Sequence, residues 1–371
     1  MDRAFPATAP EVSVIVPARN EEVCLGGCLQ SLVAQDGVAF EIIVVDDGST
    51  DRTREIAEGF AGVRVISPGP LPEGWTGKNN AVLAGVKEAR GEWLLFTDAD
   101  TVHVAGSLAR SLAEAKENGA ELLSYSPEQI AVTFWEIAVL PVVFAELARQ
   151  YPPSKVSDPA SPVAAANGQY VLIRRDTYDA VGGHTAIADS LLEDVALARR
   201  VKSSGRTIRF RYAADAVRTR MYRNFAQLRE GWTKNLALLF PQPGWMALKT
   251  LLWWGFAWGA CFYSLNRLTG VGRPWWPIAF TLAPMCLGMR LRRANFTWDM
   301  EILGASFGMP VFAYLLLRSK RAYARRDIPW KGRRYQSDHG RAKPAAPKGA
   351  FQEHGVSASL KRCPDTNLVD T

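Results

Sequence analysis

The first half of the chain alternates short, continuous apolar runs with segments of mixed polarity. The apolar runs, each predicted to be a strand, cover residues 12–16, 41–45, 63–66 and 92–97. Helices are predicted between them at about residues 21–35, 53–60 and 79–90. Apolar strands separated by helices are typical of a mostly parallel sheet that helices cover on both faces. We therefore predict an α/β domain.

Beyond residue 245 the pattern changes to long runs with few charged residues. These runs cover residues 246–266, 274–289 and 302–317. Each is near or slightly below the length that crosses a bilayer, and pairs of tryptophans lie near their ends, as in an interfacial belt. We expect transmembrane helices; buried core helices of a soluble domain are the alternative. Three crossings would place the basic tail opposite the first domain, against the positive-inside tendency, so one run could instead be re-entrant or interfacial.

These patterns divide the chain of 371 residues into segments. We expect an N-terminal segment at residues 1–10, a folded α/β domain at 11–240, membrane helices at 246–318 and a basic, partly disordered tail at 319–371. The stretch 130–148 carries Glu136 and Glu146. It is either a membrane-surface helix or the inner face of the first domain.

The formal net charge is +7 with a pI near 9.2, which favours an anionic partner. Much of the positive excess lies in Arg290–Arg293 and Arg318–Arg334, next to apolar stretches. This placement favours lipid headgroups, and we expect no nucleic-acid partner. The N-terminus has no apolar core of the signal-peptide type, so we expect the first domain in the cytosol. Five scattered cysteines argue against a disulfide scaffold.

Asp98 and Asp100 follow the last apolar run of the first domain. Side chains at i and i+2 on an extended segment point to the same side, and two adjacent carboxylates repel unless a cation lies between them. A hard divalent cation, Mg²⁺ or Mn²⁺, would bind both and keep positions free for phosphate oxygens. The alternative is a polar strand end or a helix N-cap.

A second acidic pair, Asp46 and Asp47, follows the strand predicted at residues 41–45. Ligands of parallel α/β sheets bind at the carboxyl ends of the strands, so both acidic pairs should converge in one cleft. The alternative for the second pair is an Asp-Gly turn, with Ser49 or Asp51 capping the next helix.

Several motifs occur in an order that resembles family 2 of the inverting, nucleotide-sugar-dependent glycosyltransferases. The motifs are Val14-Ile-Val-Pro-Ala-Arg-Asn-Glu21, Val44-Val-Asp-Asp-Gly-Ser-Thr-Asp51, Asp98-Ala-Asp100 and Leu192-Glu-Asp194. Three further segments resemble the branch associated with hopanoid and carotenoid biosynthesis: Gly74-Trp-Thr-Gly-Lys-Asn79, Ala166-Asn-Gly-Gln169 and Arg220-Met-Tyr-Arg223. The resemblance covers roughly residues 11–235 and implies a nucleotide-sugar-binding domain of the GT-A type.

The resemblance also implies donor-binding residues. Asp47, with Asp46 as second choice, would contact the base or ribose, and Lys78 would reach the diphosphate. Asp98 and Asp100 would hold the metal that neutralises the leaving nucleoside diphosphate. Further donor contacts are expected at Pro17, Arg19 and Glu21. A structural role is the alternative for each: a cap for the helix near Glu21, or a solvated lysine at residue 78.

Asp194 is the candidate base that takes the proton of the acceptor hydroxyl, with Glu193 in reserve. The alternative is an acidic pair that stabilises the start of a helix. Many membrane members of the family carry Gln-x-x-Arg-Trp, but here Gly231 stands where the arginine is expected. This departure argues against processive synthesis of the cellulose or chitin type. Possible acceptor or diphosphate contacts are Trp232, Lys234 and Gln169.

The leading hypothesis is a multi-pass enzyme of the inner membrane with a cytoplasmic catalytic domain. It would move a sugar, such as a hexose, from a nucleotide-diphosphate donor to a hopanoid, carotenoid or similar lipid acceptor. One alternative is transfer to a polyprenyl phosphate. Another is a catalytically silent membrane protein that only binds nucleotide sugars.

Overall fold

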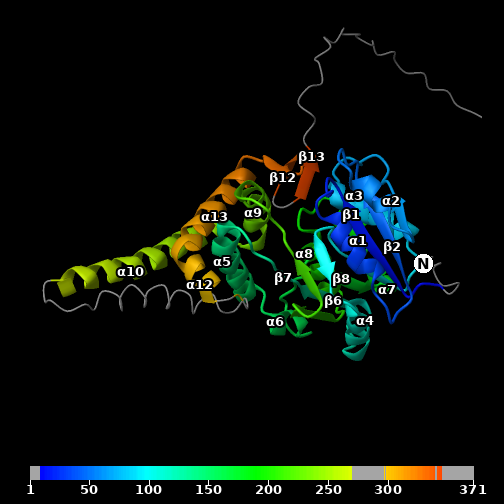
Figure 1. Ribbon diagram of the computed structural model, residues 1–371, viewed down its shortest axis with the longest axis horizontal. Coiled ribbons are helices and arrows are strands. Elements are labelled where there is room, and N and C mark those ends of the chain that lie inside the picture. The colour runs from blue at the N-terminus through cyan, green and yellow to red at the C-terminus, as the bar shows by residue number, and fades with distance from the viewer. Residues whose placement is uncertain (1–8, 270–295, 297, 339–340, 345–371) are drawn as a thin grey trace, which may run out of the picture.

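The computed structural model describes residues 9–269, 296, 298–338 and 341–344 (Figure 1). Its centre is a sheet of seven strands in the order β3-β2-β1-β4-β8-β6-β9. The strands are β1 (Val12–Ala18), β2 (Phe40–Asp46), β3 (Val63–Ile66), β4 (Trp93–Phe96), β6 (Leu122–Ser126), β8 (Val171–Arg174) and β9 (Ile208–Tyr212). All neighbours are parallel except β8, which runs antiparallel to β4 and β6. The predicted α/β architecture with a mostly parallel central sheet is confirmed.

Helices cover both faces of this sheet. The helices of the domain are α1 (Leu25–Val33), α2 (Thr53–Glu58), α3 (Gly77–Glu88), α4 (Ser107–Glu117), α6 (Pro153–Ser157), α7 (Arg175–Ala180) and α8 (Glu193–Ser203). Alternate residues of β1 pack into different cores: Val14 lies against α1 and α4, and Ile15 lies against α3. A Cβ on Gly85 would lie 2.6 Å from Ile15, so this glycine permits the close approach of α3 to the sheet.

The helix predicted at residues 21–35 begins later, at Leu25. Asn20 has a φ of 54°. The backbone N–H of Glu21 donates to Thr53 Oγ1 at 2.7 Å, and that of Glu22 donates to Asp51 Oδ2 at 3.2 Å. Because these groups bond to the loop after β2, residues 20–22 lie outside the helix and lead into it through a turn.

A small second sheet lies beside the turn after β4 that carries Asp98 and Asp100, which we call the acidic turn. It contains β5 (Thr101–His103), β10 (Val217–Thr219) and β7 (Glu128–Gln129), with β10 in the middle. This sheet connects the end of the central sheet to the helices that follow.

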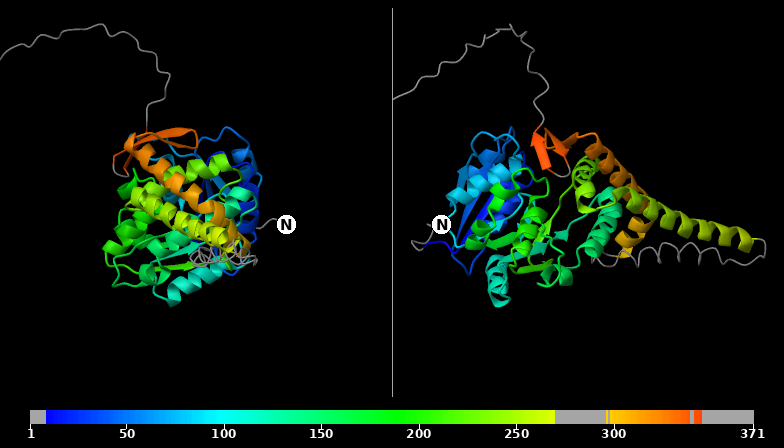
Figure 2. Two further views of the ribbon diagram at one scale, coloured as in Figure 1. Left: turned by 90° about the vertical axis from the view of Figure 1, so that its left-hand side faces the viewer. Right: turned by 180° about the vertical axis from the view of Figure 1, so that it is seen from behind.

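A helical layer lies next to the α/β domain and has its own apolar core. It consists of α5 (Phe134–Gln150), α9 (Phe225–Leu239), α10 (Pro243–Thr269), α12 (Trp298–Leu303), a π-helical turn (Gly304–Gly308) and α13 (Met309–Ala324). Glu136 on α5 is 1% exposed and accepts two hydrogen bonds from Arg220. The stretch 130–148 therefore packs inside the molecule for most of its length. Figure 2 shows α10 extending away from the rest.

In the described ranges no helix combines the length and apolarity that a membrane crossing requires. Of the predicted membrane helices, the run at 274–289 lies outside the described residues. The other two runs lie in α10 and in the segment from α12 to α13. The transmembrane helices and the proposed segment boundaries therefore stay predictions.

The first part of the expected tail is folded. Residues 319–324 complete α13, and the chain then forms β11 (Ile328–Trp330), β12 (Arg333–Asp338) and β13 (Arg341–Pro344). These strands form an antiparallel three-stranded sheet. We refer to residues 328–338 as the C-terminal hairpin. Figures 1 and 2 show it (orange) above the junction of the α/β domain and the helical layer.

Candidate active site

A cavity of about 630 Å³ opens at the carboxyl ends of β1, β2 and β4, between the α/β domain and the helical layer. Every site residue predicted from the sequence lines it: Pro17, Arg19, Glu21, Asp47, Lys78, Asp98, Asp100, Gln169, Asp194, Trp232 and Lys234. Of the two acidic pairs expected to converge in one cleft, Asp47, Asp98 and Asp100 line this cavity and Asp46 does not. The role of each residue stays a prediction.

Asp98 and Asp100 lie on the turn between β4 and β5. The hydroxyl of Thr101 donates to the carbonyl of Asp98 at 2.7 Å, which closes this turn. Asp100 Oδ1 is buried and has no hydrogen-bond partner among the described residues. Burial, Asp98 and Glu21 raise the pKa of Asp100 to about 7. This unsatisfied oxygen beside a second carboxylate fits a divalent cation.

The described residues contain no cluster of three or more acidic, histidine or cysteine side chains that could hold a metal ion. A cation at this turn would thus take two carboxylates from the protein and its other oxygens from water or a phosphate. Mg²⁺ in particular is bound in this way, by one or two carboxylates together with substrate phosphates.

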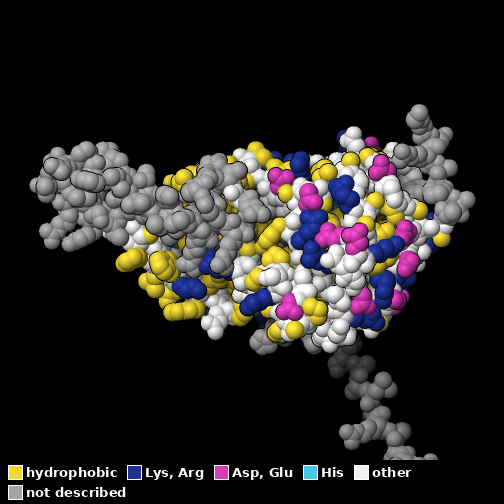
Figure 3. Space-filling view, turned by 90° about the horizontal axis from the view of Figure 1, so that it is seen from below, with side chains coloured by type: hydrophobic (Ala, Val, Ile, Leu, Met, Phe, Trp, Pro, Cys, Tyr) yellow, Lys and Arg dark blue, Asp and Glu magenta, His cyan; other side chains and the backbone are white. Residues whose placement is uncertain are grey.

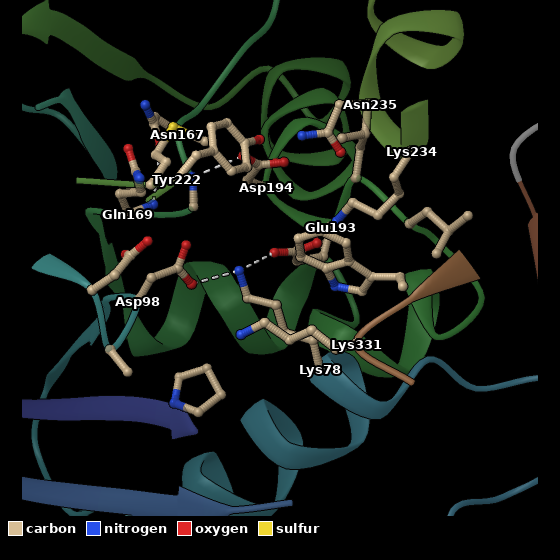
Figure 4. Close-up of a pocket in the computed structure, with 18 of the residues that line it drawn as sticks. Lys78, Asp98, Asn167, Gln169, Glu193, Asp194, Tyr222, Lys234, Asn235 and Lys331 are labelled. Atoms are coloured by element: carbon tan, nitrogen blue, oxygen red, sulfur yellow. Dashed lines mark hydrogen bonds and ion pairs between the residues drawn. The ribbon is translucent and has the colours of Figure 1, made fainter. Parts of the chain in front are cut away.

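Lys78 forms ion pairs with carboxylates of two segments that line the cavity, the turn after β4 and the start of α8. Its ammonium group lies 2.7 Å from Asp98 Oδ1 and 2.6 Å from Glu193 Oε1 (Figure 4). Burial alone would lower the pKa of Lys78, but the two carboxylates outweigh it and raise this pKa well above its ordinary value. Burial likewise opposes ionisation of Glu193, yet Lys78 lowers the pKa of Glu193 to about 2. Lys78 is therefore a cation that pairs with Asp98 and Glu193 at the same time.

Asp194 lies in the first turn of α8, next to Glu193. Its carboxylate accepts hydrogen bonds from the backbone N–H groups of Gly168 at 2.7 Å and Val195 at 2.8 Å. Burial and the neighbouring charge of Glu193 raise the pKa of Asp194 to about 6. A carboxylate with a pKa near neutrality, fixed by two N–H donors, is suited to accept a proton.

Asp46, the last residue of β2, and Asp47, the residue after it, make different contacts. Asp46 Oδ1 accepts from the backbone N–H of Ser49 at 3.1 Å and closes the turn. Asp47 instead lines the cavity, and Arg19 donates to its carbonyl at 2.8 Å. The structure therefore favours Asp47 over Asp46 as a ligand-facing residue. Asp51 Oδ1 accepts hydrogen bonds from the backbone N–H and the hydroxyl of Thr53, the first residue of α2, although the N-cap position of this helix is Arg52.

The region of the expected Gln-x-x-Arg-Trp motif lies on α9. Trp232 is 2% exposed, and its indole N–H has no hydrogen-bond partner among the described residues. The ammonium group of Lys234 lies 4.6 Å from the centre of the Trp330 ring. Gln169 donates to Thr219 Oγ1 at 3.3 Å. Trp232, Lys234 and Gln169 all line the cavity.

Part of the lining of the cavity is an apolar wall. It is formed by side chains of α5, β9 and α9 and by the residue after α5, namely Phe144, Leu147, Ala148, Tyr151, Phe210 and Leu239. Asp194 lies on the same cavity surface. The cavity thus offers charged groups for a phosphorylated ligand and apolar contacts for a second ligand.

Two site residues were missed by the sequence analysis. Arg333 of the C-terminal hairpin donates two hydrogen bonds to the carboxylate of Asp47, at 2.5 and 3.1 Å. Lys331 forms an ion pair with Glu21. The only local signal was the run Trp330-Lys-Gly-Arg-Arg334, which resembles an ordinary basic surface segment.

Part of the chain matches a known protein family. Residues 13–182 match the family model described as glycosyl transferase family 2. The 4,4'-diaponeurosporenoate glycosyltransferase of Staphylococcus aureus is 29% identical over 234 residues, which are 61% of this chain and 60% of that protein. The match thus spans less than two thirds of this relative.

Solved structures of similar shape include a mannosyltransferase from Pyrobaculum calidifontis in complex with GDP-Man and Mn²⁺. It is 16% identical, with a TM-score of 0.49 over 85% of this chain and 87% of that chain. Glucosyl-3-phosphoglycerate synthase from Mycobacterium tuberculosis is 21% identical, with a TM-score of 0.40 over 62% and 79% of the two chains. The family match is thus confined to residues 13–182, the part of the chain that carries Asp47, Lys78, Asp98 and Asp100, and this part is similar to glycosyl transferase family 2.

Proposed function

We propose that this protein transfers a sugar from a nucleotide-diphosphate donor to a hydroxyl group of an apolar, lipid-like acceptor, with inversion at the anomeric carbon. The observation that carries the proposal is the single cavity that Asp47, Asp98, Asp100 and Asp194 share. The donor would lie over the carboxyl ends of β1, β2 and β4. The acceptor would lie along the apolar wall.

In this reaction the acceptor oxygen attacks the anomeric carbon while its proton passes to the carboxylate of Asp194. The bond between the anomeric carbon and the diphosphate breaks, and the nucleoside diphosphate leaves. Asp98 and Asp100 would hold a divalent metal, Mg²⁺ or Mn²⁺, which stabilises negative charge on a leaving diphosphate when it is bound. The hydrogen bonds from Gly168 and Val195 keep Asp194 in place for the proton transfer.

The acceptor class is supported by the apolar wall and by the name of the Staphylococcus aureus relative, which specifies a carotenoid acid. Membrane attachment, with the catalytic domain on the cytoplasmic side of the inner membrane, is part of the proposal. Its support is the exposed apolar side of α10, where Leu252 and Phe256 are 60% and 71% exposed. Figure 3 shows hydrophobic side chains gathered at the end of the molecule where the C-terminal helices lie.

The direct test is transfer of radiolabelled sugar to lipid. The full-length protein is incubated with labelled UDP- and GDP-sugars, Mn²⁺ and a bacterial lipid extract, and the lipid phase is counted and analysed by mass spectrometry. We expect a labelled, acid-stable glycolipid with one donor. Absence of label from every lipid fraction contradicts the proposal, and an acid-labile, phosphate-linked product would identify a polyprenyl-phosphate acceptor instead.

A further inference from the structure

The C-terminal hairpin is held firmly above the donor end of the cavity. Its turn, Lys331-Gly332, has positive φ at both residues, 44° and 74°, as a tight two-residue hairpin turn requires. Ile328 and Tyr335 are buried and pack with Leu191 in a small apolar cluster. The turn is therefore positioned by strand pairing and apolar contacts on both sides.

The side chains at this turn reach the donor-binding loops. Arg333 binds both oxygens of Asp47, and Lys331 pairs with Glu21. Figure 4 shows Lys331 and Lys78 reaching into the same cavity. A Cβ on Gly77 would collide with the Arg333 guanidinium and would lie 2.6 Å from Asp47 Oδ2. Gly77, the first residue of α3, thus provides the space that Arg333 occupies.

The charges at the donor end show what two additional cations would contribute there. Four carboxylates line this part of the cavity, namely Glu21, Asp47, Asp98 and Asp100. The α/β domain supplies Arg19 and Lys78 nearby, and Lys78 already pairs with both Asp98 and Glu193. Because opposite charges attract, Lys331 and Arg333 would favour a nucleoside diphosphate at this end of the cavity, in addition to the metal that Asp98 and Asp100 would hold.

We propose that Arg333 and Lys331 bind the diphosphate of the nucleotide-sugar donor, so that the hairpin from the end of the chain completes the donor site. The inference rests on the proposed function. When the nucleotide binds, the hydrogen bonds between Arg333 and Asp47 break, and Asp47 contacts the nucleoside instead. The released guanidinium of Arg333 then binds the phosphate oxygens. Arginine suits this exchange because its planar fork matches carboxylate and phosphate equally. The start of α3, beside Arg333, offers backbone N–H groups to the same anion.

The test is nucleotide binding by the full-length protein, measured by calorimetry with UDP and with GDP in the presence of Mn²⁺. We expect Arg333→Gln to bind the preferred nucleotide about ten- to hundred-fold more weakly, which is the effect of losing a hydrogen bond to a charged group. Lys331→Gln should weaken binding in the same direction, and Arg333→Lys should recover part of the loss.

The matched control is Arg334→Gln. Arg334 is the next residue along the hairpin and pairs with Asp327, and it does not line the cavity. This variant should bind as the wild type does. Unfolding temperatures of all variants show whether the hairpin substitutions disturb the fold.

Gly77→Ala tests the same contact from the other side. The added methyl should displace Arg333 and weaken nucleotide binding, and its effect should be smaller in an Arg333→Ala background, where only the close contact with Asp47 Oδ2 remains. Unchanged or tighter binding by a folded Arg333→Gln protein overturns the inference, and tighter binding would mean that the hairpin blocks the site. If the wild type binds neither nucleotide, the proposed function and this inference both fail.

Discussion

Lys78 and Glu193 form an ion pair of 2.6 Å that joins the start of α3 to the start of α8. The same ammonium group binds Asp98, which lies on the turn expected to hold the metal. Asp194, the candidate base, directly follows Glu193 in the chain. The ion pairs that Lys78 forms with Asp98 and Glu193 thus extend to the residue next to Asp194, the group that would deprotonate the acceptor.

Asp194→Asn should abolish sugar transfer while donor binding stays nearly unchanged. The amide cannot accept the acceptor proton, but it keeps the shape of the side chain and one acceptor oxygen for the N–H donors. General-base catalysis commonly contributes about 10²- to 10⁴-fold to a rate, so we expect a loss of kcat in this range. Measurement of kcat together with nucleotide affinity checks this, and persistent turnover would show that Asp194 is not the base.

The rate should depend on pH through Asp194. Its carboxylate is the active form and its pKa is raised to about 6, so the rate should rise towards a plateau above pH 6 and fall about ten-fold per unit below it. Glu193→Gln removes the neighbouring negative charge and should move this acid limb to lower pH. If the acid limb of the Glu193→Gln variant stays at the wild-type pH, a group other than Asp194 controls the rate.

Lys78→Met should shift the same limb in the opposite direction, because the charge of Lys78 lowers the pKa of Asp194. It also leaves Asp98 and Glu193 without their shared cation, so nucleotide binding should weaken. Both effects are read from pH–rate profiles and calorimetry of the folded variant. Equal profiles for Lys78→Met and Glu193→Gln would contradict the described network.

Metal removal should stop the reaction. EDTA should abolish transfer, and excess Mn²⁺ or Mg²⁺ should restore it. Asp98→Asn and Asp100→Asn should each weaken Mn²⁺ binding, measured by electron paramagnetic resonance in the absence of substrate. Asp179→Asn, a change on the distant helix α7, is the matched control and should bind Mn²⁺ as the wild type does.

Stability should decrease in mild acid because of His103 and His184. Burial lowers their pKa values to about 3 and about 4, from 6.5 in an unfolded chain. The unfolded state therefore takes up protons below pH 6.5 while the folded state does not, and stability present above this pH is lost as pH falls. At pH 5 the cost is about 2 kcal/mol per histidine. Urea unfolding at pH 7 and 5 checks this, and His184→Gln should reduce the difference.

The positions of the acidic residues could be predicted because they follow directly from strand order. Asp47 and Asp98 come immediately after apolar strands, and parallel strands bring such positions to one edge of a sheet. The choice of Asp47 over Asp46 came only from family resemblance, and the structure supports it through the turn that Asp46 closes. These inferences needed only local pattern and general topology.

The partner of Asp47 could not be predicted in this way. Arg333 lies 286 positions further along the chain, and no periodicity relates the two residues. The later start of α1 has a similar cause, since the N–H groups of Glu21 and Glu22 bond to residues after β2. The pairing of Arg333 with Asp47 and the later start of α1 both depend on contacts between segments that are distant in the sequence.

The location of the C-terminal hairpin has a practical consequence for anyone who produces this protein in pieces. A fragment cut to the boundaries of the matched family region, residues 13–182, would omit Asp194, the helices α9 to α13 and both hairpin cations. Such a fragment would retain the acidic turn together with Arg19 and Lys78 but would lack Lys331 and Arg333. Expression should therefore extend at least through Asp338, the end of β12.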